Sequence, residues 1–277
     1  MSQEVVAAVI GAMIAAFASA MAAVIQTWRE ERREAQARRR QLRAEIIGLK
    51  LQTDEVMDFI KDSRRPRLPL IWKKRRADVS RANLAEADLR RQDLTNVVFF
   101  RANFTQADLS NALLRNADLA KAILVKADLS GADLKGGILD EADLSGANLA
   151  EACLERCAMK KANLVGSSLR GANAREATMT DVVLDEANAA NARFARSTLV
   201  GASMRRTILS GADLTGANLQ AADLSQADLS DADLTSAILI DACLDEATLI
   251  HTKVTEAQLS AVRSLKRAKM PDGRTHL

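Results

Sequence analysis

A five-residue repeat runs through residues 77–262 and constrains the fold more than any other feature of the sequence. The unit is Ala, then Asp or Asn, then Leu, then two variable residues, as in Ala127-Asp128-Leu129 and Ala212-Asp213-Leu214. The Leu position always falls on a residue number ending in 4 or 9, and about 37 units follow in one frame without an insertion. A period of five matches neither the 3.6 residues of an α-helix nor the 2 of a β-strand, so this segment is neither an ordinary helix nor an ordinary sheet.

A chain that turns a corner once per unit keeps a large side chain in the core every five residues. Four units then close a square coil of about 20 residues, and successive coils stack at the spacing of β-strands, about 4.8 Å. Backbone N–H and C=O groups pair with the coils above and below. We expect the Leu and the Ala to point inward, and the Asp or Asn between them to face outward and bond the local backbone.

Repeats of this motif in this number resemble those of the pentapeptide-repeat proteins. The resemblance covers about two-thirds of the chain. It implies an all-β solenoid whose form is a right-handed quadrilateral β-helix. The repeat is long enough for about nine coils, which would make a rod roughly 45 Å long.

One column of stacked core positions departs from the pattern. Ala174 is too small for a Leu position, and Phe194, one coil later, is too large. Because interiors tolerate volume-conserving changes best, we expect Phe194 to lean into the space that Ala174 leaves. Ala189, just before Phe194 along the core, would give it further room.

Composition divides the chain into five segments. They are a transmembrane anchor (1–27), a basic juxtamembrane helix (28–63), a Pro-containing basic linker that plugs the first coil (64–76), the repeat (77–262), and a C-terminal cap and tail (263–277). Docking on a membrane surface is the alternative role for residues 64–76. At the other end, Thr255 and Gln258 fit a capping box, so we expect a short helix from Glu256 to about Ala268 that covers the last coil.

Residues 5–25 contain no charge and no proline, and as a helix they would span about 31 Å, the thickness of a bilayer core. Basic residues follow this stretch rather than precede it. The positive-inside rule therefore predicts a single-pass protein of the cell inner membrane, with its N-terminus outside and the repeat in the cytoplasm. A cleavable signal peptide is disfavoured because the positive charge lies on the wrong side. The alternative is a soluble Ala-rich helix buried against a partner.

Two sets of residues near the anchor are candidate contacts. Small residues spaced by four let two membrane helices approach closely, although an Ala-rich helix also forms such stripes by chance: Gly11, Ala15, Ser19 and Ala23. Arginines just after the anchor are candidates for contact with anionic lipid: Arg29, Arg32, Arg33, Arg38, Arg39 and Arg40. The helix they begin either pairs with a second copy or lies on the rod. Nucleic acid is disfavoured as a partner, since no aromatic platform accompanies the arginines.

No catalytic constellation is visible in the sequence. There are two His and three Cys, and the Cys occupy repeat positions, which disfavours a zinc site. The Gly residues are scattered through variable repeat positions and form no phosphate-binding loop. The many Asp recur because turns favour them, not because they act as acids or bases. We therefore expect no enzyme activity, no metal, no cofactor and no small-molecule substrate.

One outward column has few charges and several aliphatic side chains, as interfaces do. We predict that it binds a protein partner or a second copy of the chain, through Val98, Phe100, Ile138, Val200, Ile238 and Ile240. The alternative is neutral drift at outward positions that tolerate any residue. The column that begins at Asp108 is more polar and more acidic.

The leading prediction of function is a membrane-anchored, non-enzymatic scaffold that presents a rigid rod to a cytoplasmic protein. The alternative follows from the resemblance, because some pentapeptide-repeat proteins bind DNA gyrase by imitating the shape and charge of DNA. Residues 77–262 carry 18 Lys and Arg against 26 Asp and Glu, so the repeat is only mildly acidic. Its unbroken frame also lacks the loops through which some gyrase-binding relatives act.

Overall fold

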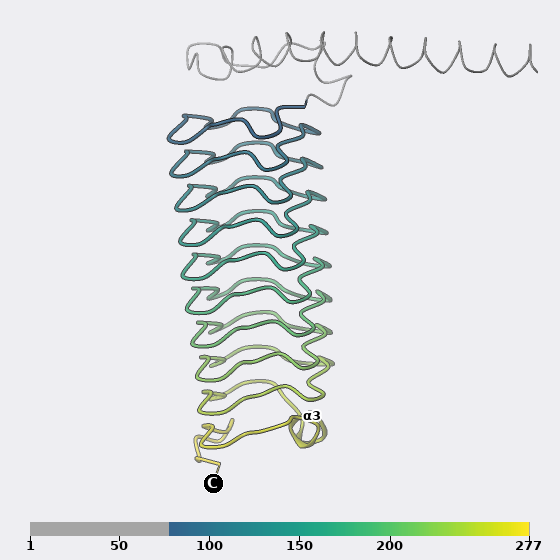
Figure 1. Ribbon diagram of the computed structural model, residues 1–277. Helices are drawn as coiled ribbons and strands as arrows, with labels where there is room; N and C mark the ends of the chain where they lie inside the picture. Colours follow the sequence, from purple (N-terminus) through teal and green to yellow (C-terminus); the bar gives the residue numbers. More distant parts are fainter. Residues whose placement is uncertain (1–77, 277) are drawn as a thin grey trace, which may run out of the picture. The chain divides into compact units, whose positions relative to one another are not determined.

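The computed structural model describes residues 78–276, which form a stack of coils around one axis (Figure 1). Isolated parallel β-bridges join each residue whose number ends in 3 or 8 to the residue 20 positions later, from Asp78–Val98 to Asp233–Lys253. Four such bridge positions occur per coil, so the rod has four walls. We name them wall 1 (78, 98 and onward to 238), wall 2 (83 to 243), wall 3 (88 to 248) and wall 4 (93 to 253).

The core confirms the inward positions predicted from the repeat. Leu side chains from Leu84 to Leu249 are almost completely buried, and so are the Ala side chains two residues before them from Ala102 onward. Each coil bonds its neighbours in a fixed pattern, in which Leu109 N–H donates to Asp128 O at 2.7 Å and Asp128 N–H donates to Ala107 O at 2.9 Å. These bonds satisfy the backbone without any long strand.

The outward Asp and Asn positions also behave as predicted. Their side-chain oxygen accepts the N–H of the residue two positions later, as Asp108 Oδ1 does from Ser110 at 3.0 Å. Where that residue is Ser or Thr, the hydroxyl adds a second bond, which is 2.7 Å long for Ser110 Oγ. The short polar side chain therefore stabilises each turn locally, which explains why the repeat contains it so often.

Each corner requires a left-handed backbone, which the sequence analysis did not recognise. From Arg81 to His251, residues whose numbers end in 1 or 6 have φ between 53° and 68°, as in Asn116 at 53° and Gly171 at 68°. Eight repeat glycines occupy this position, so their placement is not scattered. Glycine and asparagine are favoured there because other residues pay a steric cost for positive φ. The two variable residues of the unit therefore differ in conformation.

At the C-terminal end, the short helix α3 (Glu256–Ser260) replaces the strand that would have continued wall 1. The capping box is present, with Thr255 and Gln258 bonding each other's backbone N–H groups. The Nε2 of Gln258 also donates to Leu234 O at 2.7 Å and to Ala237 O at 2.9 Å. In every earlier coil, a backbone N–H on wall 1 donates to the carbonyl 21 residues before it. In this last coil, the side-chain amide of Gln258 donates to that carbonyl, Ala237 O, in its place.

The helix expected as far as Ala268 is wrong in its length. After Ser260 the chain returns to the coil, where Ser264 and Lys269 bridge to Cys243 and Thr248. These bridges span 21 residues instead of 20, because the helix absorbs one extra residue. Ala268 is fully buried in the core, and Lys269 pairs antiparallel with Thr275 in a terminal hairpin.

The described residues do not decide the remaining predictions about the fold. Phe194, Ala174 and Ala189 are all fully buried, so the lean of Phe194 towards Ala174 stays a prediction. No helix in residues 78–276 is long and apolar enough to cross a bilayer. The predicted anchor, juxtamembrane helix and plug, with Gly11, Ala15, Ser19 and Ala23 and the arginines from Arg29 to Arg40, lie outside the described residues.

Candidate interaction surface

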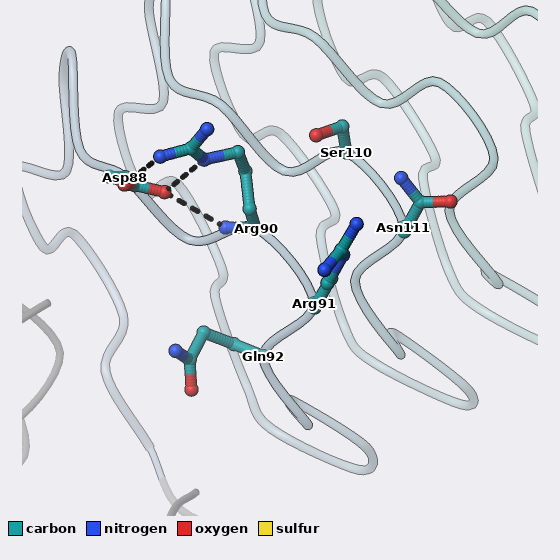
Figure 2. Close-up of a pocket in the computed structure, with 6 residues that line it drawn as sticks. All are labelled: Asp88, Arg90, Arg91, Gln92, Ser110 and Asn111. Carbon is teal, nitrogen blue, oxygen red and sulfur yellow. Dashed lines mark hydrogen bonds and ion pairs between the residues drawn. The ribbon is translucent and has the colours of Figure 1, made fainter. Parts of the chain in front are cut away.

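The hollow at the N-terminal part of the rod is polar, and none of the side chains that line it is an activated nucleophile. Figure 2 shows its lining, in which the guanidinium of Arg90 reaches Asp88. Two bonds join them, from Nη2 to Oδ2 at 2.6 Å and from Nε to Oδ1 at 2.8 Å. These bonds hold the pKa of Asp88 below its usual value. A carboxylate whose pKa is lowered in this way is only weakly basic, so it is a poor general base near neutral pH.

A second hollow lies on the corner between walls 2 and 3, and ion pairs line it as well. Asp185 accepts hydrogen bonds from Ser203 Oγ at 2.6 Å and from the Arg205 guanidinium at 2.6 Å. Burial raises the pKa of Asp185, but the bonds from Arg205 and Ser203 outweigh it, so the pKa lies below its usual value. These side chains join neighbouring coils, and their bonds are already used within the rod.

The nucleophilic and metal-binding side chains of the described residues are dispersed. Burial raises the pKa of the Cys157 thiol to about 12, and its Sγ donates to Leu134 O at 3.0 Å. A thiol of this kind is a core side chain and not a nucleophile. His251 Nδ1 lies 3.5 Å from Asp231 Oδ1 on the open surface. Within residues 78–276, no three His, Cys, Asp or Glu side chains come together to hold a metal ion.

The predicted partner surface lies on wall 1. Two of its six residues lie on one of the first coils, two lie on the last, and the other two lie on coils between. Val98 and Phe100 are half-buried on one of the first coils, and Ile238 and Ile240 are 42% and 48% exposed on the last. Ile138 and Val200 are half-buried on coils between them. The Arg101 guanidinium covers the ring of Phe100 at 5.2 Å. The six side chains therefore share one wall but do not form a single continuous patch.

Exposed aliphatic side chains also occur on the other walls, which the sequence analysis missed. Leu113 on wall 4, Ile123 on wall 2 and Ile208 on wall 3 are each 40% to 43% exposed. A column-by-column comparison of all four walls in the sequence would have found them. Exposed aliphatics alone therefore do not distinguish wall 1.

Absence of charge does distinguish the C-terminal half of wall 1. Residues 207–250 contain eight Asp and Glu and no Lys or Arg. Of these acids only Asp241 borders wall 1, and the others lie on walls 2 to 4 and their corners. The outward side chains of wall 1 in its last four coils are all uncharged: Thr178, Thr180, Thr198, Val200, Asn218, Gln220, Ile238 and Ile240. Depletion of charge is typical of the centre of a protein interface.

Comparison with known proteins agrees with this architecture. The family profile described as pentapeptide repeats (8 copies) matches residues 75–99, 98–136, 127–164, 142–181, 177–216 and 212–249. None of the curated proteins matches the chain.

Two solved structures illustrate the similarity. HetL, a pentapeptide repeat protein involved in heterocyst differentiation regulation in Nostoc sp. strain PCC 7120, is 34% identical over 74% of this chain and 96% of its own, with a TM-score of 0.40. QnrB1, a plasmid-mediated fluoroquinolone resistance protein, is 20% identical over 70% of this chain and 89% of its own, with a TM-score of 0.33. With its unbroken repeat, its four-walled coils and the match to the family profile, this chain belongs to the pentapeptide repeat family.

Proposed function

We propose that this protein is a non-enzymatic, membrane-anchored interaction module whose repeat domain presents wall 1 to a protein. The observation that carries the proposal is the uncharged half of wall 1, whose last two coils belong to a segment that is otherwise acidic. Removing a charged side chain from water is costly, so a face without charges is the easiest one to cover with a partner. The ladder of bridges keeps that face rigid, which lowers the entropy lost on binding.

The side-chain chemistry of the described residues supports a binding role. The two ion-paired hollows offer no activated nucleophile, and the thiol of Cys157 is buried. The Asp side chains are engaged in turns, as Asp128 is with the N–H of Ser130 at 2.9 Å. Members of this family generally act as interaction modules rather than as enzymes.

Charge substitutions on two walls test the binding surface. Ile138→Asp, Ile238→Asp and Ile240→Asp should each weaken the cross-linked complexes that the full-length protein forms in cells. Asn148→Asp and Asn188→Asp add the same charge to wall 3 and should leave those complexes unchanged. Equal effects on the two walls would disprove the assignment of the surface.

The membrane anchor rests on the apolar stretch 5–25 and the basic residues after it. We expect full-length protein to stay in the inner-membrane fraction after an alkaline carbonate wash, and a chain that begins at Trp28 to be released. Two soluble proteins would remove the anchor from the proposal, and the apolar stretch would then be a helix that binds a partner or a second copy.

Binding to DNA gyrase is the second candidate, and the acidic stretch 207–250 is the observation that favours it. The preceding residues 151–206 weaken it, since they carry nine Lys and Arg against six Asp and Glu. A supercoiling assay decides between the candidates. Protection of gyrase from a quinolone by the purified protein would support this second function, and no effect at micromolar protein would exclude it.

A further inference from the structure

We propose that wall 1 binds wall 1 of a second copy, with the two rods face to face and antiparallel. This inference rests on the proposed function, because it takes wall 1 as the protein-binding surface and names its partner. The first observation is the symmetry of the wall itself. Two apolar rows lie near its two ends, one with Val98 and Phe100 and the other with Ile238 and Ile240, and only the row of Asp78 lies beyond Val98.

The bridge ladder defines which residues such a pair would bring together. Wall 1 has nine rows from Asp78 to Ile238, each 20 residues apart, and the eight rows from Val98 onward take part in this contact. A two-fold axis that crosses the wall between the row of Ala158 and the row of Thr178 reverses the order of the rows. Each residue then faces the residue at the same position across the width of the wall. Val98 then faces Ile238 of the second copy, and Phe100 faces Ile240. Interfaces with two-fold symmetry must be self-complementary in this way.

Charges on the two edges of the wall obey the same symmetry. Along the edge towards wall 2, the axis places Lys161 opposite Asp181, and Arg101 opposite Asp241. None of these four has an ion pair among the described residues, and Arg101 lies over the ring of Phe100 at the same edge. Opposite charges facing each other across an interface favour the correct partner and the correct register.

The other edge and the interior of the wall contain no like-charged pair. Arg156 lies opposite Glu176, a pair that also forms within one chain at 2.8 Å between Nε and Oε2. Two acidic side chains lie on the face of the wall in these rows. Asp140 faces Val200, and its Oδ1 already accepts the N–H of Lys160; Asp118 faces Asn218, and its Oδ1 accepts the N–H of Ala120.

Parallel rods fit much less well. An axis along the rod would set Lys161 beside Arg156 and Asp181 beside Glu176. Like charges in direct apposition disfavour a contact by several kcal/mol, at about the scale known from protein interfaces. The antiparallel arrangement is therefore the one that the charges select.

The same antiparallel operation brings carboxylates together on two of the other walls. Centred on the rod, it would place Asp108 opposite Asp228 on wall 3 and Asp133 opposite Asp213 on wall 4. On wall 2 the eight rows from Asn103 to Cys243 also meet without a like-charged pair, so the charges alone favour walls 1 and 2, and the apolar side chains at both ends of the contact favour wall 1.

The size of the contact indicates a reversible dimer. Eight rows at β-strand spacing make a strip about 38 Å long and one wall wide. This is near the lower limit of specific protein interfaces, which corresponds to weak or transient complexes. The two rods would begin at opposite ends of the dimer.

Disulfide trapping tests the register in full-length protein that carries Cys153→Ser and Cys243→Ser and keeps the buried Cys157. Phe100→Cys and Ile240→Cys are made as two single variants and are then mixed. The antiparallel dimer keeps two copies of position 240 about 34 Å apart, whereas positions 100 and 240 meet. We expect a cross-linked dimer only in the mixture. A dimer from either single variant, or none from the mixture, would overturn the proposal.

Charge exchange tests the same register without cysteine. Lys161→Asp or Asp181→Lys alone places like charges opposite each other and should weaken self-association by about tenfold in sedimentation velocity. The double variant should restore it, which a merely destabilised rod would not do. Self-association that is equally weak in the single and double variants contradicts the register. If the protein sediments as a monomer while Ile238→Asp still abolishes a complex with another protein, the dimer is wrong and the proposed function stands.

Discussion

The core of residues 157–207 and the core of residues 209–249 obey the same frame but differ in their contents. From Leu209 to Leu249 every large inward position is Leu, and every small one is Ala. In residues 157–207 the large positions include Ala174, Phe194 and three Met, and the small positions include Cys, Ser, Thr and Val. Both segments are equally buried and equally regular in their bridges. The period therefore specifies the coil, whereas the identity of each inward residue sets only the local packing.

The irregular segment also has polar atoms in the core, and only some of them form hydrogen bonds. Thr207 Oγ1 donates to Leu184 O at 2.8 Å, and Cys157 Sγ bonds the corresponding carbonyl of Leu134. The hydroxyls of Ser167 and Ser197 are buried at equivalent positions without a hydrogen-bond partner among the described residues. The regular segment has no such cost, so we expect it to be the more stable of the two.

The largest effect is expected where the irregular core depends on one bulky side chain. Phe194→Ala should lower the free energy of unfolding by about 3–5 kcal/mol, measured by urea denaturation, because it leaves a cavity where a fully buried ring had been. Phe194→Leu with Ala174→Leu should recover most of the loss by making the column regular. A loss below about 1 kcal/mol for Phe194→Ala would disprove the packing of Phe194 into the space beside Ala174.

A smaller loss is expected at the bonded hydroxyl of the same segment. Thr207→Val keeps the size of the side chain but removes the bond to Leu184 O. We expect the free energy of unfolding to fall by about 1 kcal/mol. Val182 already occupies a small inward position nearby, so a large loss would indicate a steric problem instead of a lost bond.

The opposite sign is expected at Ser167, which lies in the same column as Thr207. Ser167→Ala removes an unpaired buried hydroxyl. It should raise the midpoint of thermal unfolding, with a gain of up to about 1 kcal/mol. Ser197→Ala should behave in the same way. Destabilisation by both changes would show that a water molecule or another group satisfies these hydroxyls.

The smallest effect is expected from a half-buried carboxylate in the regular segment. Hydrogen bonds from Thr235 and the ammonium of Lys253 lower the pKa of Asp233 to about 2. Because the folded pKa lies below the unfolded one, the stabilisation is complete above about pH 4 and is lost as the pH falls to about 2. Asp233→Asn should flatten the dependence of stability on pH in this window, and an unchanged slope would contradict the assignment.

Most of the fold and part of the candidate surface could be predicted because the repeat is local. Each unit contains its own turn residue and its own inward pair, so the frame alone identified the core from Leu84 to Leu249 and the column containing Val98 and Ile238. The left-handed corners were missed because Arg, Glu and Lys occupy many of them, as at Arg101 and Lys121, and these residue types carry no signal for positive φ.

The sequence by itself determined the period, the four walls and the outward turns, since all of these follow from contacts within one unit or between neighbouring coils. Only the tertiary structure decided how the rod ends. The capping box at Thr255 competes with the bridge ladder, and the helix it forms adds one residue to the coil and shifts the last bridges from 20 to 21 residues. The helix is tolerated there because the side-chain amide of Gln258 bonds Ala237 O, the carbonyl that a strand would have covered, and also Leu234 O.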